Sequence, residues 1–89
     1  MKDLLPIGSI VLLKDSTRRV MITGRVQKEV GQDAKTWDYC SCLYPEGNIN
    51  PEQSFLFDHE QIERVYFIGF QDEEEFAFMD YLKQLYDKQ

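Results

Sequence analysis

The residues of this chain that could do chemistry gather in its middle third, where both cysteines and the single histidine occur. Cys40 and Cys42 are separated by one residue, and His59 follows Asp58. On a β-strand, residues at this spacing point to one face about 6.5–7 Å apart, which strains a disulfide between them. A zinc site would need two further ligands, such as Asp58 and His59, and the usual two-residue cysteine spacing is absent. We therefore expect reduced thiols that act as small apolar residues, and keep as an alternative a small metal-dependent regulator or enzyme that uses Cys40, Cys42 and His59.

The carboxylates beside the histidine are candidates for an acid–base cluster. Asp58, Glu60 and Glu63 flank His59, but neighbours in a helical turn point in different directions, and no nucleophile with an oriented base is evident. Neither GxGxxG nor GxxxxGK occurs, so the glycines predict backbone geometry rather than a phosphate-binding loop. The sequence therefore predicts a protein that is not an enzyme, with no catalytic residue, cofactor or metal.

Length and charge narrow the class of protein. A chain of 89 residues with 43% hydrophobic residues predicts one domain over residues 1–89, strand-rich over 4–70. The net charge of −6 argues against nucleic acid, which requires clustered lysine and arginine. No apolar run approaches the ~20 residues that cross a bilayer, and the start does not resemble a signal peptide. We expect a cytoplasmic protein that does not insert into membranes, with homo-oligomerisation left open.

The hydrophobic pattern predicts an α+β fold. Strands are expected over residues 10–13, 19–26, 37–44, 55–57 and 64–70, with one helical turn at 58–61 and a terminal helix over about 72–87. Asp72 is the expected N-cap, and Glu75 completes a capping-box spacing. Gly24 favours a sharp bend in the second strand. We therefore predict a small, strongly bent antiparallel sheet or SH3-like barrel of four to five strands with a C-terminal helix.

Spacing also predicts which faces are buried. In the second strand one face is expected to carry Val20, Ile22, Gly24 and Val26. In the terminal helix an apolar stripe is expected to pack on the sheet and to comprise Phe78, Met79, Leu82, Leu85 and Tyr86. Phe76 lies away from the centre of that stripe, so we expect it to be exposed.

Aromatic residues are more numerous than so small a core needs, because they make up 13% of the chain. The third strand leads into a turn-rich segment, and such loops on a rigid scaffold commonly carry recognition residues. We therefore predict a protein-binding surface that comprises Trp37, Tyr39, Tyr44, Pro45, Glu46, Phe55, Phe57 and Phe76. The alternative is that this segment only connects strands.

Three stretches carry a family resemblance. They read LLPIGSIVLLK over residues 4–14, YCSCLYPEGN over 39–48 and FLFDHEQIERVYFIGFQDEEE over 55–75. Together they resemble the domain-of-unknown-function 4176 family, short proteins of Gram-positive bacteria. The family's two signatures correspond here to residues 44–48 and to Phe57, His59, Ile62, Gly69, Asp72, Glu73 and Glu74.

The resemblance implies a functional setting without catalytic residues. Members of this family are encoded beside type VII secretion components and LXG-domain toxins, which implies an accessory, chaperone-like or targeting role for a secretion substrate. An immunity protein that neutralises a toxin domain is the alternative within the binding class.

Overall fold

The computed structural model describes residues 3–28, 35–50, 52 and 54–87, with residues 86 and 87 described by their backbone alone. Its elements are β1 (Ile10–Leu13), β2 (Arg19–Lys28), β3 (Thr36–Leu43), β4 (Phe55–Phe57), a 3₁₀ turn (His59–Gln61), β5 (Ile62–Phe67) and α1 (Glu73–Asp87). Most of the connection expected between the second and third strands lies outside the described residues. The predicted elements are therefore confirmed in type and order where the structure describes them.

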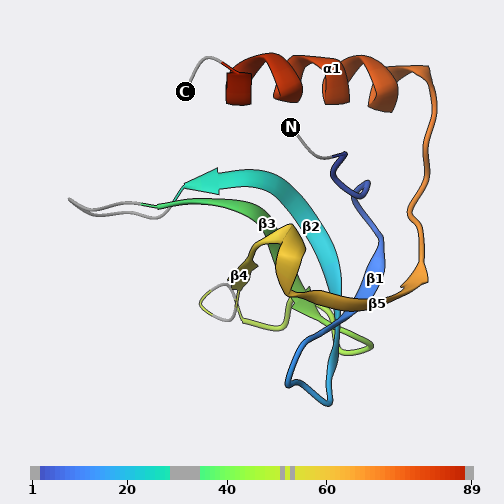
Figure 1. Ribbon diagram of the computed structural model, residues 1–89. Helices are drawn as coiled ribbons and strands as arrows, with labels where there is room; N and C mark the ends of the chain where they lie inside the picture. Colours follow the sequence, from blue (N-terminus) through green and yellow to red (C-terminus); the bar gives the residue numbers. More distant parts are fainter. Residues whose placement is uncertain (1–2, 29–34, 51, 53, 88–89) are drawn as a thin grey trace.

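The five strands form one antiparallel sheet in the order β4-β3-β2-β1-β5. The α+β class is confirmed, and the sheet is open, with β4 and β5 at its two edges. β2 and β3 curve strongly over their length (Figure 1). Of the two forms predicted, the bent open sheet is the one found. β1 lies inside the sheet, between β2 and β5.

A β-bulge in β2 changes which residues face the interior. Ile22 pairs with Ser41 while Gly24 pairs with Cys40, so one additional residue is inserted between them. An inserted residue exchanges the two faces of the strand beyond it. Arg25, which pairs with Tyr39, is therefore buried. Strict alternation over Val20, Ile22, Gly24 and Val26 was wrong beyond the bulge, where Arg25 takes the buried position, although Val26 still packs against the core.

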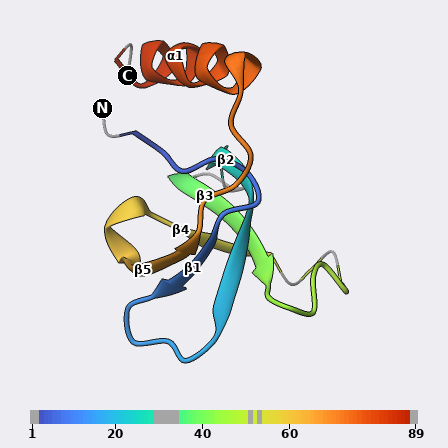
Figure 2. The ribbon, with the colours of Figure 1, turned by 90° about the vertical axis from the view of Figure 1, so that its right-hand side faces the viewer.

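Helix α1 lies at one end of the molecule, and the N-terminal segment runs between it and the sheet (Figures 1 and 2). Leu4 of that segment and Leu82 of α1 both belong to the buried core. Met79 and Leu85 pack against the same core, as predicted. Phe78 is 45% exposed, so its assignment to the packed stripe was wrong.

Two turns are capped by side chains, and the cap of α1 was predicted from local spacing. The N–H of Glu75 donates to Asp72 Oδ1 at 3.0 Å, which caps the start of α1. The N–H of Asp58 donates to Gln61 Oε1 at 2.8 Å, one half of the capping box at the 3₁₀ turn.

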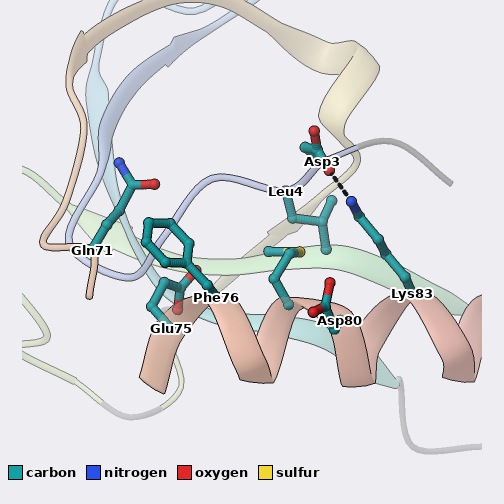
Figure 3. A pocket seen from close by; sticks show the side chains of 8 residues that line it. Asp3, Leu4, Gln71, Glu75, Phe76, Asp80 and Lys83 are labelled. Carbon is teal, nitrogen blue, oxygen red and sulfur yellow. Dashed lines mark ion pairs between the residues drawn. The ribbon is translucent and has the colours of Figure 1, made fainter. Parts of the chain in front are cut away.

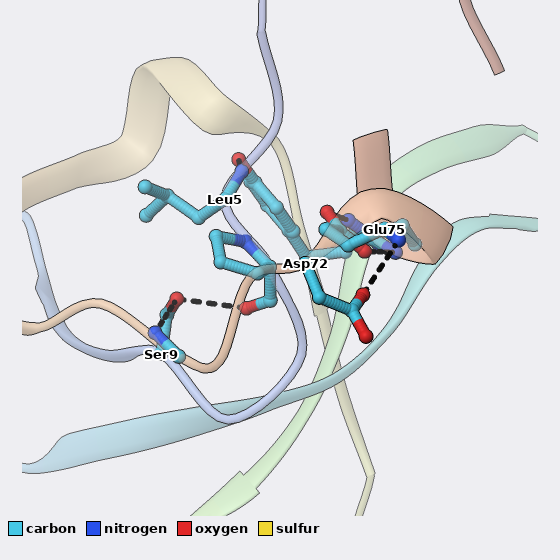
Figure 4. A network of polar contacts seen from close by, with 8 residues as sticks. Leu5, Ser9, Asp72 and Glu75 are labelled. Carbon is cyan, nitrogen blue, oxygen red and sulfur yellow. Dashed lines mark hydrogen bonds and ion pairs between the residues drawn. The ribbon is translucent and has the colours of Figure 1, made fainter. Parts of the chain in front are cut away.

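A buried hydroxyl joins the N-terminal segment to the connection between β5 and α1. Ser9 Oγ donates to the carbonyl of Pro6 at 2.7 Å and accepts from the N–H of Gly69 at 3.0 Å. The backbone of Ser9 also bonds β2, because the N–H of Ile22 donates to the Ser9 carbonyl at 2.8 Å. Figure 4 shows this segment, with Leu5 and Ser9, beside Asp72 and Glu75 at the start of α1. These bonds explain why β5 ends at Phe67, earlier than predicted.

Candidate functional site

A groove lies where strands β1, β2 and β5 meet the turn after β3. It encloses about 480 Å³ and is lined by Ile10, Arg19, Tyr44, Tyr66 and Phe67, which we call the cation–aromatic groove. Tyr66 reaches it because it is the additional residue of a second bulge, between the pairs Ile10–Phe67 and Val11–Val65. The groove is large enough for a side chain of a partner or for a short peptide segment.

Arg19 gives this groove its positive charge, and Arg64 lies beside the groove on the ring of Tyr66. The guanidinium carbon of Arg19 lies 5.3 Å from the ring centre of Tyr44 and 5.1 Å from that of Tyr66. The guanidinium carbon of Arg64 lies 5.4 Å from the ring centre of the same Tyr66. Cation–π contacts fix guanidinium planes without neutralising them. Within the described part of the chain, neither Arg19 nor Arg64 forms an ion pair with a carboxylate.

Two of the predicted binding residues are core residues. Tyr39 is 0% exposed and Phe57 is 1% exposed, with their ring centres 5.0 Å apart. The Tyr39 hydroxyl accepts the N–H of Leu5 at 2.9 Å and lies 2.6 Å from His59 Nδ1. The two residues pair across β3 and β4 and belong to the hydrophobic core, so their buried side chains stabilise the fold and are not exposed to a partner.

Trp37 and Phe55 lie away from the cation–aromatic groove. Trp37 is half-buried beneath Lys35, whose Nζ lies 3.8 Å from a ring centre of the indole. Its indole Nε1 is buried and has no hydrogen-bond partner among the described residues. Phe55 is 41% exposed on the edge strand β4. Neither residue lines the groove that Tyr44 lines, so the predicted residues do not form a single surface.

The turn after β3 holds three further predicted residues. Tyr44 is one wall of the groove, and the Tyr44–Pro45 peptide is cis. Glu46 pairs with Arg18 of the β1–β2 turn, and the hydrogen bond from that guanidinium lowers the pKa of Glu46 below its ordinary value of 4.5. The Arg18–Glu46 pair ties the turn after β3 to the sheet, beside Arg19.

Phe76 is exposed, as predicted, and lies on a different face. It lines a cavity of about 280 Å³ between α1 and the N-terminal segment, together with Leu4 and Met79. Figure 3 shows Asp3 and Lys83 facing each other across this cavity. Their ion pair of 2.5 Å lowers the pKa of Asp3 and raises that of Lys83.

A second exposed apolar region surrounds the start of α1. It is lined by Ile7, Phe70 and Phe78, and its polar residues include Asp72, Glu74 and Glu75. Arg25 lies at its base, where its guanidinium forms a two-fold ion pair with Glu75, one contact measuring 2.7 Å. This region therefore presents carboxylates, in contrast to the cation–aromatic groove.

Comparison with known proteins gives one match. The family model described as "Domain of unknown function (DUF4176)" matches residues 4–78. The chain belongs to the DUF4176 family. No curated protein and no solved structure matches it. The DUF4176 match covers the whole sheet and the start of α1.

The stretches that carry the DUF4176 resemblance are partly structural in this chain. In residues 44–48 only Tyr44 lines the groove, while the N–H of Gly47 donates to the Leu43 carbonyl at 2.8 Å and closes the turn. Gly69 and Asp72 hold the connection to α1 and its first turn. The residues of the groove that sequence reasoning missed are Ile10, Arg19, Tyr66 and Phe67. The unbroken apolar run over residues 65–68 was a signal of an exposed binding surface, because a strand with one buried face needs only every second residue to be apolar.

The cysteines and the histidine of this DUF4176 chain lie apart from the groove. Cys40 is partly buried and Cys42 buried, and both are free thiols. The imidazole Nδ1 of His59 hydrogen-bonds with the Tyr39 hydroxyl, and the backbone N–H of His59 donates to Asp38 Oδ2 at 2.9 Å. Among the described residues no three His, Cys, Asp or Glu side chains are grouped to hold a metal ion. No helix in the described ranges is long and apolar enough to span a membrane.

Proposed function

We propose that this chain is a non-enzymatic protein-interaction module that acts in the cytoplasm as an accessory, chaperone-like or targeting protein for a type VII secretion substrate such as an LXG toxin. The observation that carries the proposal is the exposed apolar edge of the sheet. Val65 is 43% exposed, Phe67 58% and Ile68 50%, and Tyr66 beside them lines the cation–aromatic groove.

Such a surface supports protein binding on physical grounds. Exposed apolar patches with a polar rim are typical of contact sites, and tyrosine and arginine are the residues that most often dominate binding energy. The groove combines two tyrosines with Arg19, next to the exposed run on β5. The secretion setting comes from the family resemblance, and the surface supplies the means of binding.

The test begins with the tagged full-length protein, used to retain binding proteins from a lysate of its host. A single retained secretion substrate is then produced and purified, and its affinity is measured by titration calorimetry. Tyr44→Ala and Tyr66→Ala should each weaken binding at least about fivefold, since truncating a central anchor commonly costs more than 1 kcal/mol.

Tyr81→Ala is the matched control, because Tyr81 is an exposed tyrosine on α1 outside the groove. Its affinity should equal that of the unsubstituted protein. Equal affinity in all three variants would refute this surface as the contact site. Failure of the folded protein to retain any secretion substrate would refute the proposed function.

A further inference from the structure

We infer that the β5 edge and the cation–aromatic groove bind an extended, acidic segment of the partner protein, which lies along residues 65–68 and places carboxylates on Arg19 and Arg64. This inference rests on the proposed function, and it names the chemistry and conformation of the bound segment.

The sheet edge supplies the first argument. β5 pairs with β1 on one side, and no strand in the described part of the chain pairs with its other side. Edge strands are normally protected by charged residues, proline or shortness, since their unpaired backbone attracts another chain. β5 carries its charged residues, Glu63 and Arg64, in its first half, whereas the following residues 65–68 read Val-Tyr-Phe-Ile and contain neither charge nor proline. The opposite edge, β4, has only three residues.

Unpaired charge supplies the second argument. The chain contains 16 acidic residues, yet none of them lines the groove. Arg19 and Arg64 are held against tyrosine rings and form no ion pair with a carboxylate of the described residues. An oriented guanidinium without an anion matches a carboxylate in a partner. The groove therefore selects an acidic segment over a neutral or basic one.

The conformation follows from the shape of the site. Side chains of a segment that lies along β5 alternate between two faces, so every second residue points toward the face that carries Arg64 and Phe67. Phe67 pairs with Ile10 and Arg64 pairs with Leu12, which places them on the groove side of the sheet. Acidic residues at alternate positions would thus reach both arginines while the intervening residues contact the apolar edge.

A second copy of this chain fits less well. The β5 strand of a second copy carries one carboxylate, Glu63, and one guanidinium, Arg64, so it adds no net negative charge. The positive charge of the groove would therefore remain. The other exposed apolar region, around Ile7, Phe70 and Phe78, is bordered by carboxylates and would repel an acidic segment. The charges therefore favour a foreign acidic segment on β5.

The test uses a random-peptide library displayed on phage and selected on the immobilised full-length protein. Selected peptides should carry acidic residues at alternate positions among β-branched or aromatic ones. One of them is synthesised together with an analogue in which amides replace its carboxylates. The affinity of each peptide is measured by titration calorimetry at about 0.15 M salt. At this salt concentration the Debye length is about 8 Å, so charges farther apart contribute little to the affinity.

Arg19→Gln combined with Arg64→Gln should weaken the acidic peptide at least about tenfold and leave the amide analogue unchanged. Lys28→Gln is the matched control, since it removes one exposed positive charge at the other end of β2, outside the groove. Its affinity should stay within about twofold. Thermal unfolding of each variant shows that the fold is retained.

Hydrogen exchange gives the readout of conformation. The bound peptide should slow exchange of the amides in residues 65–68 and leave those of α1 unchanged. Selection of helical or non-acidic peptides, no enrichment at all, or a dimer in ultracentrifugation that occupies β5 would each overturn the inference. The proposed function would survive those results if the chain still retains its secretion substrate from lysate, and would fall with the inference if it does not.

Discussion

At the scale of single residues, Gly69 shows how backbone contact rather than a side chain fixes the chain path. A Cβ at this position would lie 2.1 Å from the carbonyl oxygen of Ile7 and 3.1 Å from the carbonyl carbon of Gly8. The contacted atoms belong to the backbone, so no rotamer change relieves the overlap. Only glycine allows the connection from β5 to α1 to cross the N-terminal segment this closely.

Gly69→Ala should therefore destabilise the protein by about 3 kcal/mol or more, the upper range for overpacking. Gly47→Ala is the control, because Gly47 has open space around it and costs only the strain of its φ of +82°, about 1 kcal/mol. Denaturant unfolding of both variants measures the difference. Equal losses would show that the backbone at Gly69 can move aside.

At the scale of elements, the orientation of α1 depends on one ion pair. Arg25, whose side chain is 2% exposed, bonds Glu75 through both guanidinium nitrogens of its fork. Glu75, Met79 and Leu82 follow each other at helical spacing, so a helix held at Glu75 turns Met79 and Leu82 toward the core. Phe78 then lies to one side, with its ring centre 5.4 Å from the guanidinium carbon of Arg25.

Glu75→Ala should destabilise the protein by about 3–5 kcal/mol, because it leaves the buried guanidinium of Arg25 without its counter-ion. The double variant Arg25→Met with Glu75→Leu should recover most of that loss, since no buried charge remains. Denaturant unfolding of the single and double variants gives the coupling between the two residues. A double variant no more stable than Glu75→Ala would contradict this account.

The same ion pair marks where sequence reasoning stopped. The order of the strands and the helix and the Asp72 cap of α1 follow from local spacing and were predicted, whereas β5 begins and ends earlier than expected. Arg25 could not be placed inside, because the inserted residue of the bulge reverses the strand faces and leaves no trace in hydrophobic alternation. The groove was missed for a related reason: Arg19, Tyr44 and Tyr66 come together only through strand order and a bulge in β5. Tyr39 and Phe57 were misplaced because aromatic type alone does not distinguish core from surface.

At the scale of the whole molecule, charge is divided between the two parts of the chain. Residues 1–31 carry six basic and three acidic groups, while residues 32–89 carry four and thirteen. Ion pairs connect the two parts: Arg18 with Glu46, Arg25 with Glu75 and Asp3 with Lys83. The Asp3–Lys83 pair joins the N-terminal segment to the C-terminal helix across the cavity at Phe76. Folding therefore brings opposite charges together that are distant in sequence.

The stability that these exposed pairs supply should depend on pH in a definite direction. Lys83 lowers the pKa of Asp3 below 3.8, so the folded state favours the ionised carboxyl. Stability from this carboxyl is then complete above pH 3.8 and is lost as the pH falls through the lowered pKa. Asp3 in turn raises the pKa of Lys83 above 10.5, so the contribution of the lysine is complete below pH 10.5 and is lost as the pH rises through the raised pKa.

Melting temperatures of the unsubstituted protein and of Asp3→Asn, measured from about pH 2 to pH 11, test this coupling. Asp3→Asn should melt at a slightly lower temperature across neutral pH, because exposed ion pairs contribute little. That difference should vanish at the acid end, where Asp3 is protonated in both folded and unfolded chains and the pair no longer exists. Glu52→Gln, which removes an exposed carboxyl that forms no ion pair within the described residues, should give no such vanishing difference. A gap between Asp3→Asn and the unsubstituted protein that persists at the acid end would mean that Asp3 holds the N-terminal segment by packing rather than by charge.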